Sequence, residues 1–154
     1  MPDYTIREDD LSGEAIAALL RLHLDEMHAW SPPCSVHAMA IERLRAPDVT
    51  FFSAWDWDRL AACGAIKHLD ESHGELKSMR AHPDYRGKGA GKAVLVHLLQ
   101  VAGERGYTRV SLETGNTEPF LPAQRLYAAH GFAECGPFAD YAADPFSHFM
   151  TRTL

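Results

Sequence analysis

The chain has 154 residues, 46% of them hydrophobic, which is enough to bury one sizeable core, so we expect a single domain over residues 1–154. Its formal net charge of −6 argues against general binding to nucleic acid or to an anionic membrane. No run reaches the roughly 18 apolar residues of a membrane span, and the start MPDYTIREDD lacks the apolar segment of a signal peptide, so we expect a cytoplasmic protein.

Changes in hydrophobic period divide the chain into helices and strands. Ser12 is a candidate N-cap for the first helix, and Gly131 is expected to end the last one. In chain order the expected elements are a strand at 3–8, helices at 12–30 and 35–46, strands at 49–55, 60–69 and 73–82, a helix at 91–104, a strand at 108–114, a helix at 122–132 and a strand at 148–154. This order indicates a mixed α/β layered domain.

One segment of this acidic chain is basic. Residues 76–92 carry one anion, Asp84, and five cations: Lys77, Arg80, Arg86, Lys88 and Lys92. This local excess predicts an anionic ligand. Lys77 and Arg80 could hold a carboxylate of such a ligand, or they could simply belong to a solvated strand face.

The same segment contains a glycine-rich loop, HPDYRGKGAGKAV at 82–94. Its glycines read GxGxG rather than the GxGxxG of dinucleotide-binding proteins, and a Walker A loop would need glycine at Arg86 and serine or threonine at Ala93. Glycines before a helix nevertheless let backbone amides face a phosphate group. Spacing alone leaves a pyrophosphate site and a simple flexible turn equally open.

Two motifs together resemble the GNAT superfamily of acyl-CoA-dependent N-acyltransferases. RGKGAG resembles its Arg/Gln-x-x-Gly-x-Gly/Ala signature between a strand and a helix, and AQRLYAAHGF at 123–132 resembles its Ala-x-x-Leu-Tyr-x-x-x-Gly-Phe segment. The order of elements is similar over nearly the whole chain. The resemblance implies a GNAT-type α/β fold, in which a mixed, mostly antiparallel central sheet has helices on both faces.

The resemblance also implies acetyl-CoA as co-substrate and no metal. Its pyrophosphate would lie on the amides of Arg86, Gly87, Lys88, Gly89, Ala90 and Gly91, with Lys88 or Lys92 near phosphate oxygens. Its pantetheine arm would pair like a strand with the backbone of Met79, Arg80 and Ala81, because two neighbouring strands separate at this point in the family.

Acetyl transfer needs a neutral amine and a proton for the departing thiolate. Tyr127 falls on the family's tyrosine and is the candidate acid. Glu75 lies where several members carry a glutamate and is the candidate base. Glu113 and a chain of water molecules are the alternative candidates for the base. Either glutamate could instead be a structural carboxylate.

The chain departs from the family pattern near the acceptor. Many members have asparagine seven residues before the tyrosine, where this chain has Phe120, with Asn116 four residues earlier. The apolar PFLP segment at 119–122 is therefore expected to shape the acceptor pocket. His37 and Trp30 lie in the region that forms one wall of the acceptor cleft in the superfamily.

Neither the nine histidines nor the three cysteines show a metal-binding spacing such as HExxH or CxxC. We therefore interpret the chain as an N-acetyltransferase that transfers acetyl directly, in a ternary complex, to the primary amine of a small molecule or peptide. A non-catalytic acyl-CoA-binding sensor or scaffold is the alternative, against which Tyr127 argues. A homodimer is left open.

Overall fold

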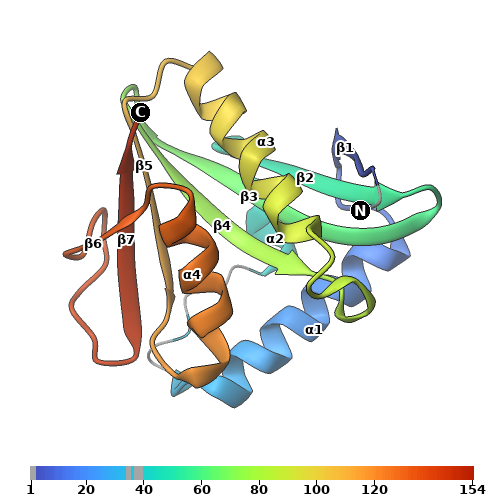
Figure 1. Ribbon diagram of the computed structural model, residues 1–154, viewed down its shortest axis with the longest axis horizontal. Helices are drawn as coiled ribbons and strands as arrows, with labels where there is room; N and C mark the ends of the chain where they lie inside the picture. The colour runs from blue at the N-terminus through green and yellow to red at the C-terminus, as the bar shows by residue number, and fades with distance from the viewer. Residues whose placement is uncertain (1–2, 34–35, 37–39) are drawn as a thin grey trace.

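The computed structural model describes residues 3–33, 36 and 40–154, and within them seven strands form one sheet in the order β1-β2-β3-β4-β5-β7-β6 (Figure 1). The elements are β1 (Thr5–Glu8), α1 (Glu14–Trp30), α2 (Ile41–Leu44), β2 (Val49–Asp56), β3 (Arg59–Asp70), β4 (His73–Ala81), η2 (Pro83–Tyr85), α3 (Ala90–Glu104), β5 (Arg109–Gly115), η3 (Glu118–Phe120), α4 (Leu121–Ala129), β6 (Ala133–Cys135) and β7 (Ser147–Thr153). Among the described strands, only β4 and β5 pair in parallel. The expected mixed, mostly antiparallel sheet is confirmed.

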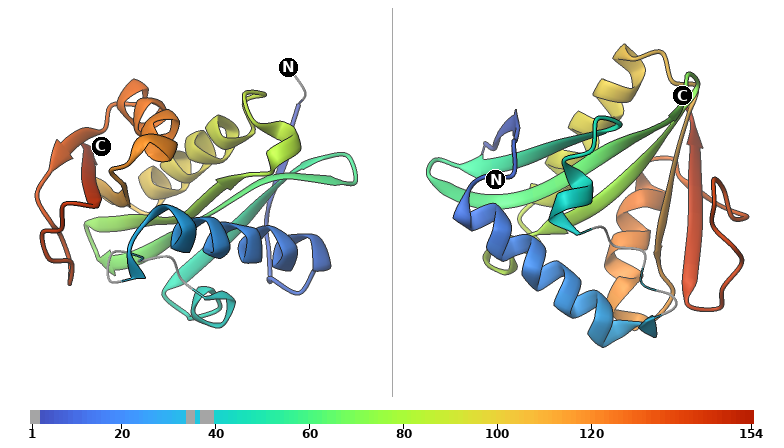
Figure 2. Two further views of the ribbon diagram at one scale, coloured as in Figure 1. Left: turned by 90° about the horizontal axis from the view of Figure 1, so that it is seen from below. Right: turned by 180° about the vertical axis from the view of Figure 1, so that it is seen from behind.

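Helices cover both faces of this sheet, so that it is a middle layer (Figure 2). Helices α1 and α2 pack on one face, where Ile16 and Leu20 belong to one buried cluster with Phe51 of β2. Helices α3 and α4 cover the other face, where Leu98 of α3 and Ile66 of β3 belong to one buried cluster. The apolar residues of α1 recur three and four positions apart, which places them on one side of the helix.

Three local expectations need correction. Gly13, not Ser12, is the N-cap of α1, because Ser12 Oγ already donates to Asp10 Oδ1 at 2.6 Å in the preceding turn. The second helix is the single turn α2 rather than 35–46, and residues 34–35 and 37–39 of that stretch lie outside the described residues. Strand β6 was not expected, since three residues are too few to display an alternating pattern.

Candidate active site

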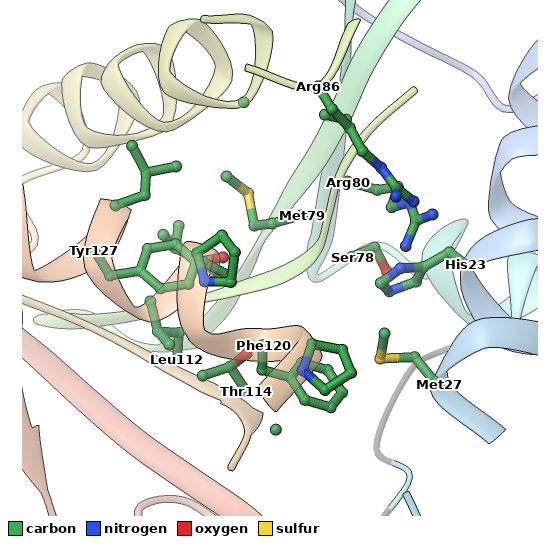
Figure 3. A pocket seen from close by; sticks show the side chains of 18 of the residues that line it. His23, Met27, Ser78, Met79, Arg80, Arg86, Leu112, Thr114, Phe120 and Tyr127 are labelled. Carbon is green, nitrogen blue, oxygen red and sulfur yellow. The ribbon is translucent and has the colours of Figure 1, made fainter. Parts of the chain in front are cut away.

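Strands β4 and β5 separate halfway along their length. Their parallel pairing ends at Leu76 and Leu112, whereas β4 continues beside β3 to Ala81. Ser78, just beyond the separation, has a positive φ of 53° at a point where the register of β4 against β3 shifts, which marks a bulge. The separation leaves a cleft of about 580 Å³ that residues from α1, α3 and α4 also line (Figure 3).

The glycine loop closes one end of this cleft. Gly87 has a φ of 73° and Gly89, the N-cap of α3, a φ of 80°, a backbone conformation that side chains with a Cβ rarely adopt. A Cβ added at Gly87 would meet no atom within 4 Å, so the space beside this backbone is open. The first amides of an α-helix have no intrahelical partner and lie at its positive end. This end of the cleft fits a pyrophosphate.

Most residues predicted to contact the cofactor line the cleft. They are Met79, Arg80, Ala81, Arg86, Gly87, Gly89, Ala90, Gly91 and Lys92. Lys88 does not line it: its Nζ lies 5.6 Å from the centre of the Tyr85 ring, and its carbonyl accepts a 2.8 Å hydrogen bond from Tyr4. Past its separation from β5, the facing edge of β4 is open for strand-like pairing with an amide-bearing ligand.

Tyr127 enters the cleft from α4. The side chain is buried, its ring packs edge-on against Phe132 with 5.8 Å between ring centres, and burial raises the pKa of its hydroxyl above the usual value. The hydroxyl has no hydrogen-bond partner among the residues that the structure describes. Tyr127 is therefore a protonated group that is available to a reacting atom in the cleft (Figure 3).

Glu113 lines the cleft from β5, just past the point where β5 leaves β4. Burial raises the pKa of its carboxyl from 4.5 to about 7, and the positive charge of Lys77 opposes this shift. A carboxyl with a pKa near neutrality can both take and release a proton at physiological pH, which suits a general base.

Glu75 lies outside the cleft lining and is only 2% exposed. Its Oε2 accepts a 2.6 Å hydrogen bond from the hydroxyl of Tyr141 and lies 3.4 Å from Lys77 Nζ. Lys77 Nζ in turn donates to the Tyr141 oxygen at 2.8 Å. The sequence carried no signal for Tyr141, because it lies in the irregular segment between β6 and β7.

Aromatic side chains form one wall at the end of the cleft away from the glycine loop. The rings of Trp30 and Phe120 meet edge-on with 5.5 Å between their centres. Gly115 allows this packing, since a Cβ there would come within 2.1 Å of the Phe120 ring. Asn116 does not line the cleft and donates instead to the carbonyl of Pro145 at 3.3 Å. His37, the other expected wall residue, lies outside the described residues.

Polar and charged side chains line the adjoining part of the cleft, between α1, β4 and the glycine loop. The guanidinium of Arg80 forms an ion pair with Glu26, and Arg86 Nη2 lies 3.3 Å from the same oxygen of Glu26. His23 of α1 is buried here, and burial lowers the pKa of its imidazole to about 4, so the ring is neutral at pH 7. Sequence spacing singled out neither His23 nor Glu26 as part of the site.

In the part of the chain that the structure describes, no three histidine, cysteine, aspartate or glutamate side chains lie together in a way that could hold a metal ion. Nor does any helix of that part have the length and the apolar content needed to cross a membrane.

Comparisons with known proteins agree with this geometry. Residues 16–132 match the model of the Acetyltransferase (GNAT) family. The chain is 51% identical to Uncharacterized N-acetyltransferase YsnE of Bacillus subtilis (strain 168), with 97% of this chain and 99% of that protein covered. It is 49% identical to Uncharacterized N-acetyltransferase YedL of Escherichia coli (strain K12), with 98% and 95% covered. The fold is similar to a GNAT family acetyltransferase from Elizabethkingia anophelis with acetyl-CoA bound, at a TM-score of 0.74, 17% identity and 100% coverage of both chains.

Proposed function

The chain belongs to the GNAT acetyltransferase family and is an acetyl-CoA-dependent N-acetyltransferase, and we propose that it transfers the acetyl group directly to the primary amine of a small molecule or peptide. One observation carries the proposal: Tyr127 of α4 and Glu113 of β5 line the same cleft from different elements. A proton donor and a proton acceptor in one cleft are what attack of an amine on a thioester requires.

The glycine loop and β4 are proposed to hold acetyl-CoA. The backbone amides from Arg86 to Gly91, Lys88 included, would bind its pyrophosphate with Lys92 near the phosphate oxygens, and the backbone of Met79 to Ala81 would pair with its pantetheine arm. When bound, acetyl-CoA supplies an acetyl group activated as a thioester.

Tyr127 is the proposed general acid. Its hydroxyl gives its proton to the sulfur of coenzyme A as the bond between sulfur and the acetyl carbon breaks. The hydroxyl is protonated at neutral pH, as a proton donor must be, since burial raises its pKa further above the usual value.

Glu113 is the proposed general base, and the negative charge of Glu75 acts on it from outside the cleft. A free alkyl ammonium has a pKa of about 10.4, so the acceptor must lose a proton before it can attack. Glu113 lines the cleft and titrates near neutral pH, whereas the carboxylate of Glu75 is occupied by Tyr141 and Lys77. Glu75 thus contributes mainly through its negative charge beside Glu113.

The described cysteines favour direct transfer over an acetyl-cysteine intermediate. Neither Cys63 nor Cys135 lines the cleft, and burial raises the pKa of the Cys63 thiol to about 12, which keeps it protonated and unreactive. With no nucleophilic thiol of the described residues in the cleft, the amine itself is the proposed nucleophile.

Initial rates measured while the concentrations of acetyl-CoA and an acceptor amine are varied together test the proposal. Direct transfer in a ternary complex predicts intersecting double-reciprocal lines and release of one free thiol for each amide formed. Parallel lines would indicate a covalent acetyl-enzyme and contradict it. Binding of acetyl-CoA without thiol release across a broad amine panel would instead point to a non-catalytic sensor.

A further inference from the structure

The α1 side of the cleft holds three polar side-chain atoms that are buried and have no hydrogen-bond partner among the described residues. They are His23 Nδ1, Ser78 Oγ and Arg80 Nε. All three residues line the cleft, and Figure 3 draws them together on its side nearest α1. A buried polar atom without a partner destabilises a protein, so three on one wall indicate a group that a bound ligand completes.

The chemistry of these atoms selects an oxygen-bearing ligand. Arg80 Nε can only donate a hydrogen bond, and the hydroxyl of Ser78 can donate as well. Ser78 is also held at a φ of 53°, a strained conformation for a residue with a Cβ, which is characteristic of functional positions. Ser78 and Arg80, two residues apart at the β4 bulge, could each donate a hydrogen bond to an oxygen of a carboxylate.

The charge of this wall agrees with an anion. Arg80 and Arg86 share a single carboxylate, that of Glu26, which leaves one positive charge in excess. Arg80 is 8% exposed, so its charge acts in a poorly hydrated environment where attraction to an anion is strong. His23 is neutral and adds no charge, although its ring remains a hydrogen-bonding group.

The adjoining aromatic wall suits an apolar body. Trp30 and Phe120 pack edge-on there, and Met27 of α1 lies between this wall and the polar one (Figure 3). The Arg80 guanidinium lies 5.9 Å from the centre of the Trp30 ring, so the cationic and aromatic surfaces adjoin.

We propose that the acceptor is an amino acid with an apolar or aromatic side chain, whose carboxylate binds to Arg80 and Ser78 and whose side chain packs against Trp30 and Phe120. Its amine would then face Glu113 across the cleft. The inference rests on the proposed function, because it requires that the acceptor amine bind in this cleft.

Matched acceptors test the role of the carboxylate. L-phenylalanine, its amide and 2-phenylethylamine share a primary amine and the aromatic body, and only L-phenylalanine carries a carboxylate. Because their ammonium groups differ in pKa, the rates are compared per concentration of neutral amine. At saturating acetyl-CoA, kcat/KM for L-phenylalanine is expected to exceed the values for the other two by at least about tenfold, since a charge-assisted pair of hydrogen bonds is lost in both. Equal values for the three compounds would overturn the inference.

Binding of the products gives a second readout that does not depend on turnover. With coenzyme A present, N-acetyl-L-phenylalanine should bind at least about tenfold more tightly than N-acetyl-2-phenylethylamine in isothermal titration. Equal affinity, or no binding of either compound, would count against the carboxylate site.

Two variants connect this preference to the named residues. Ser78→Ala keeps the Cβ and so adds no backbone strain, and Arg80→Gln leaves Glu26 paired with Arg86. Each should reduce the ratio of kcat/KM for L-phenylalanine to that for 2-phenylethylamine by about tenfold. Arg59→Gln is the control, because Arg59 pairs with Asp84 outside the cleft and its loss should leave the ratio unchanged. An unchanged ratio in Ser78→Ala and Arg80→Gln would refute the assignment.

Failure of this inference is distinguishable from failure of the proposed function. Equal thiol release with all three amines would refute the carboxylate site and leave the N-acetyltransferase mechanism intact. No thiol release with any amine of a broad panel, despite binding of acetyl-CoA, would contradict the mechanism and the inference together.

Discussion

Tyr141 donates its hydroxyl proton to Glu75 Oε2 at 2.6 Å, across 66 positions of the sequence. The same tyrosine oxygen accepts from Lys77 Nζ at 2.8 Å, so the carboxylate of Glu75 is held by two partners beneath the cleft surface. Glu113, on the neighbouring strand, is the carboxyl that lines the cleft. Glu75 and Glu113 are both candidate bases in the sequence, and this arrangement gives them different surroundings.

The pH dependence of the rate is expected to distinguish these two glutamates. Because Glu113 must lose its proton to act as a base, kcat/KM should fall as pH decreases below about 7, the pKa that burial gives this carboxyl. Glu113→Gln should lower kcat by about 10²-fold or more and remove that limb of the profile. Glu75→Gln should keep the limb and move it to lower pH, since the negative charge of Glu75 helps to raise the pKa of Glu113. Loss of the limb in Glu75→Gln alone would assign the base to Glu75.

The burial of Glu113 should also change how the stability of the protein depends on pH. The pKa of this carboxyl is about 7 in the folded state and 4.5 for an ordinary glutamate. The folded state therefore binds an extra proton between these pH values, and stability falls as pH rises from 4.5 to 7. The full effect above pH 7 is at most about 3 kcal/mol, since one pKa unit corresponds to about 1.4 kcal/mol. Chemical denaturation at pH 5 and pH 8 should therefore show that Glu113→Gln is stabilised relative to the natural chain at pH 8 and much less at pH 5. The same difference at both pH values would contradict the shift.

Replacing Tyr127 by phenylalanine tests the general acid without disturbing the packing. The ring and its contact with Phe132 are retained, and the hydroxyl has no partner among the described residues whose loss would destabilise the fold. We expect kcat to fall by about 10²-fold, while the affinity for acetyl-CoA and the melting temperature change little. A rate within about twofold of the natural chain would mean that Tyr127 is only a packed aromatic residue.

Substitutions at two glycines with the same φ can distinguish the effect of backbone strain from a loss of cofactor binding. Gly89 and Gly106 both have a φ of 80°, but Gly89 lines the cleft and Gly106 follows the far end of α3. Valine at either position should lower stability by about 1–3 kcal/mol through backbone strain. Only Gly89→Val should also weaken acetyl-CoA binding, by more than about tenfold in isothermal titration, because its side chain occupies the space beside the amides. Equal cofactor affinity in the two variants would mean that the loop is only a turn.

Much of the fold and one end of the site follow from local patterns in the sequence. The apolar spacing of α1 and α3 and the short apolar runs of β2 and β3 predict these elements, because each residue's preference there depends on neighbours a few positions away. The glycine loop is predictable for the same reason, since positive φ angles at Gly87 and Gly89 are a local property of the backbone.

The choice of catalytic carboxyl and the acceptor wall depended on the tertiary structure. Glu75 lies opposite Ser111 where β4 and β5 are still paired, whereas Glu113 lies two residues further along β5, past the separation. Contacts between residues more than 30 positions apart produce that difference. They also place Tyr141 over Glu75 and let two arginines share Glu26. Such contacts leave no periodic trace in the chain, because strand register and the packing of an irregular segment are set by long-range burial rather than by local backbone preference.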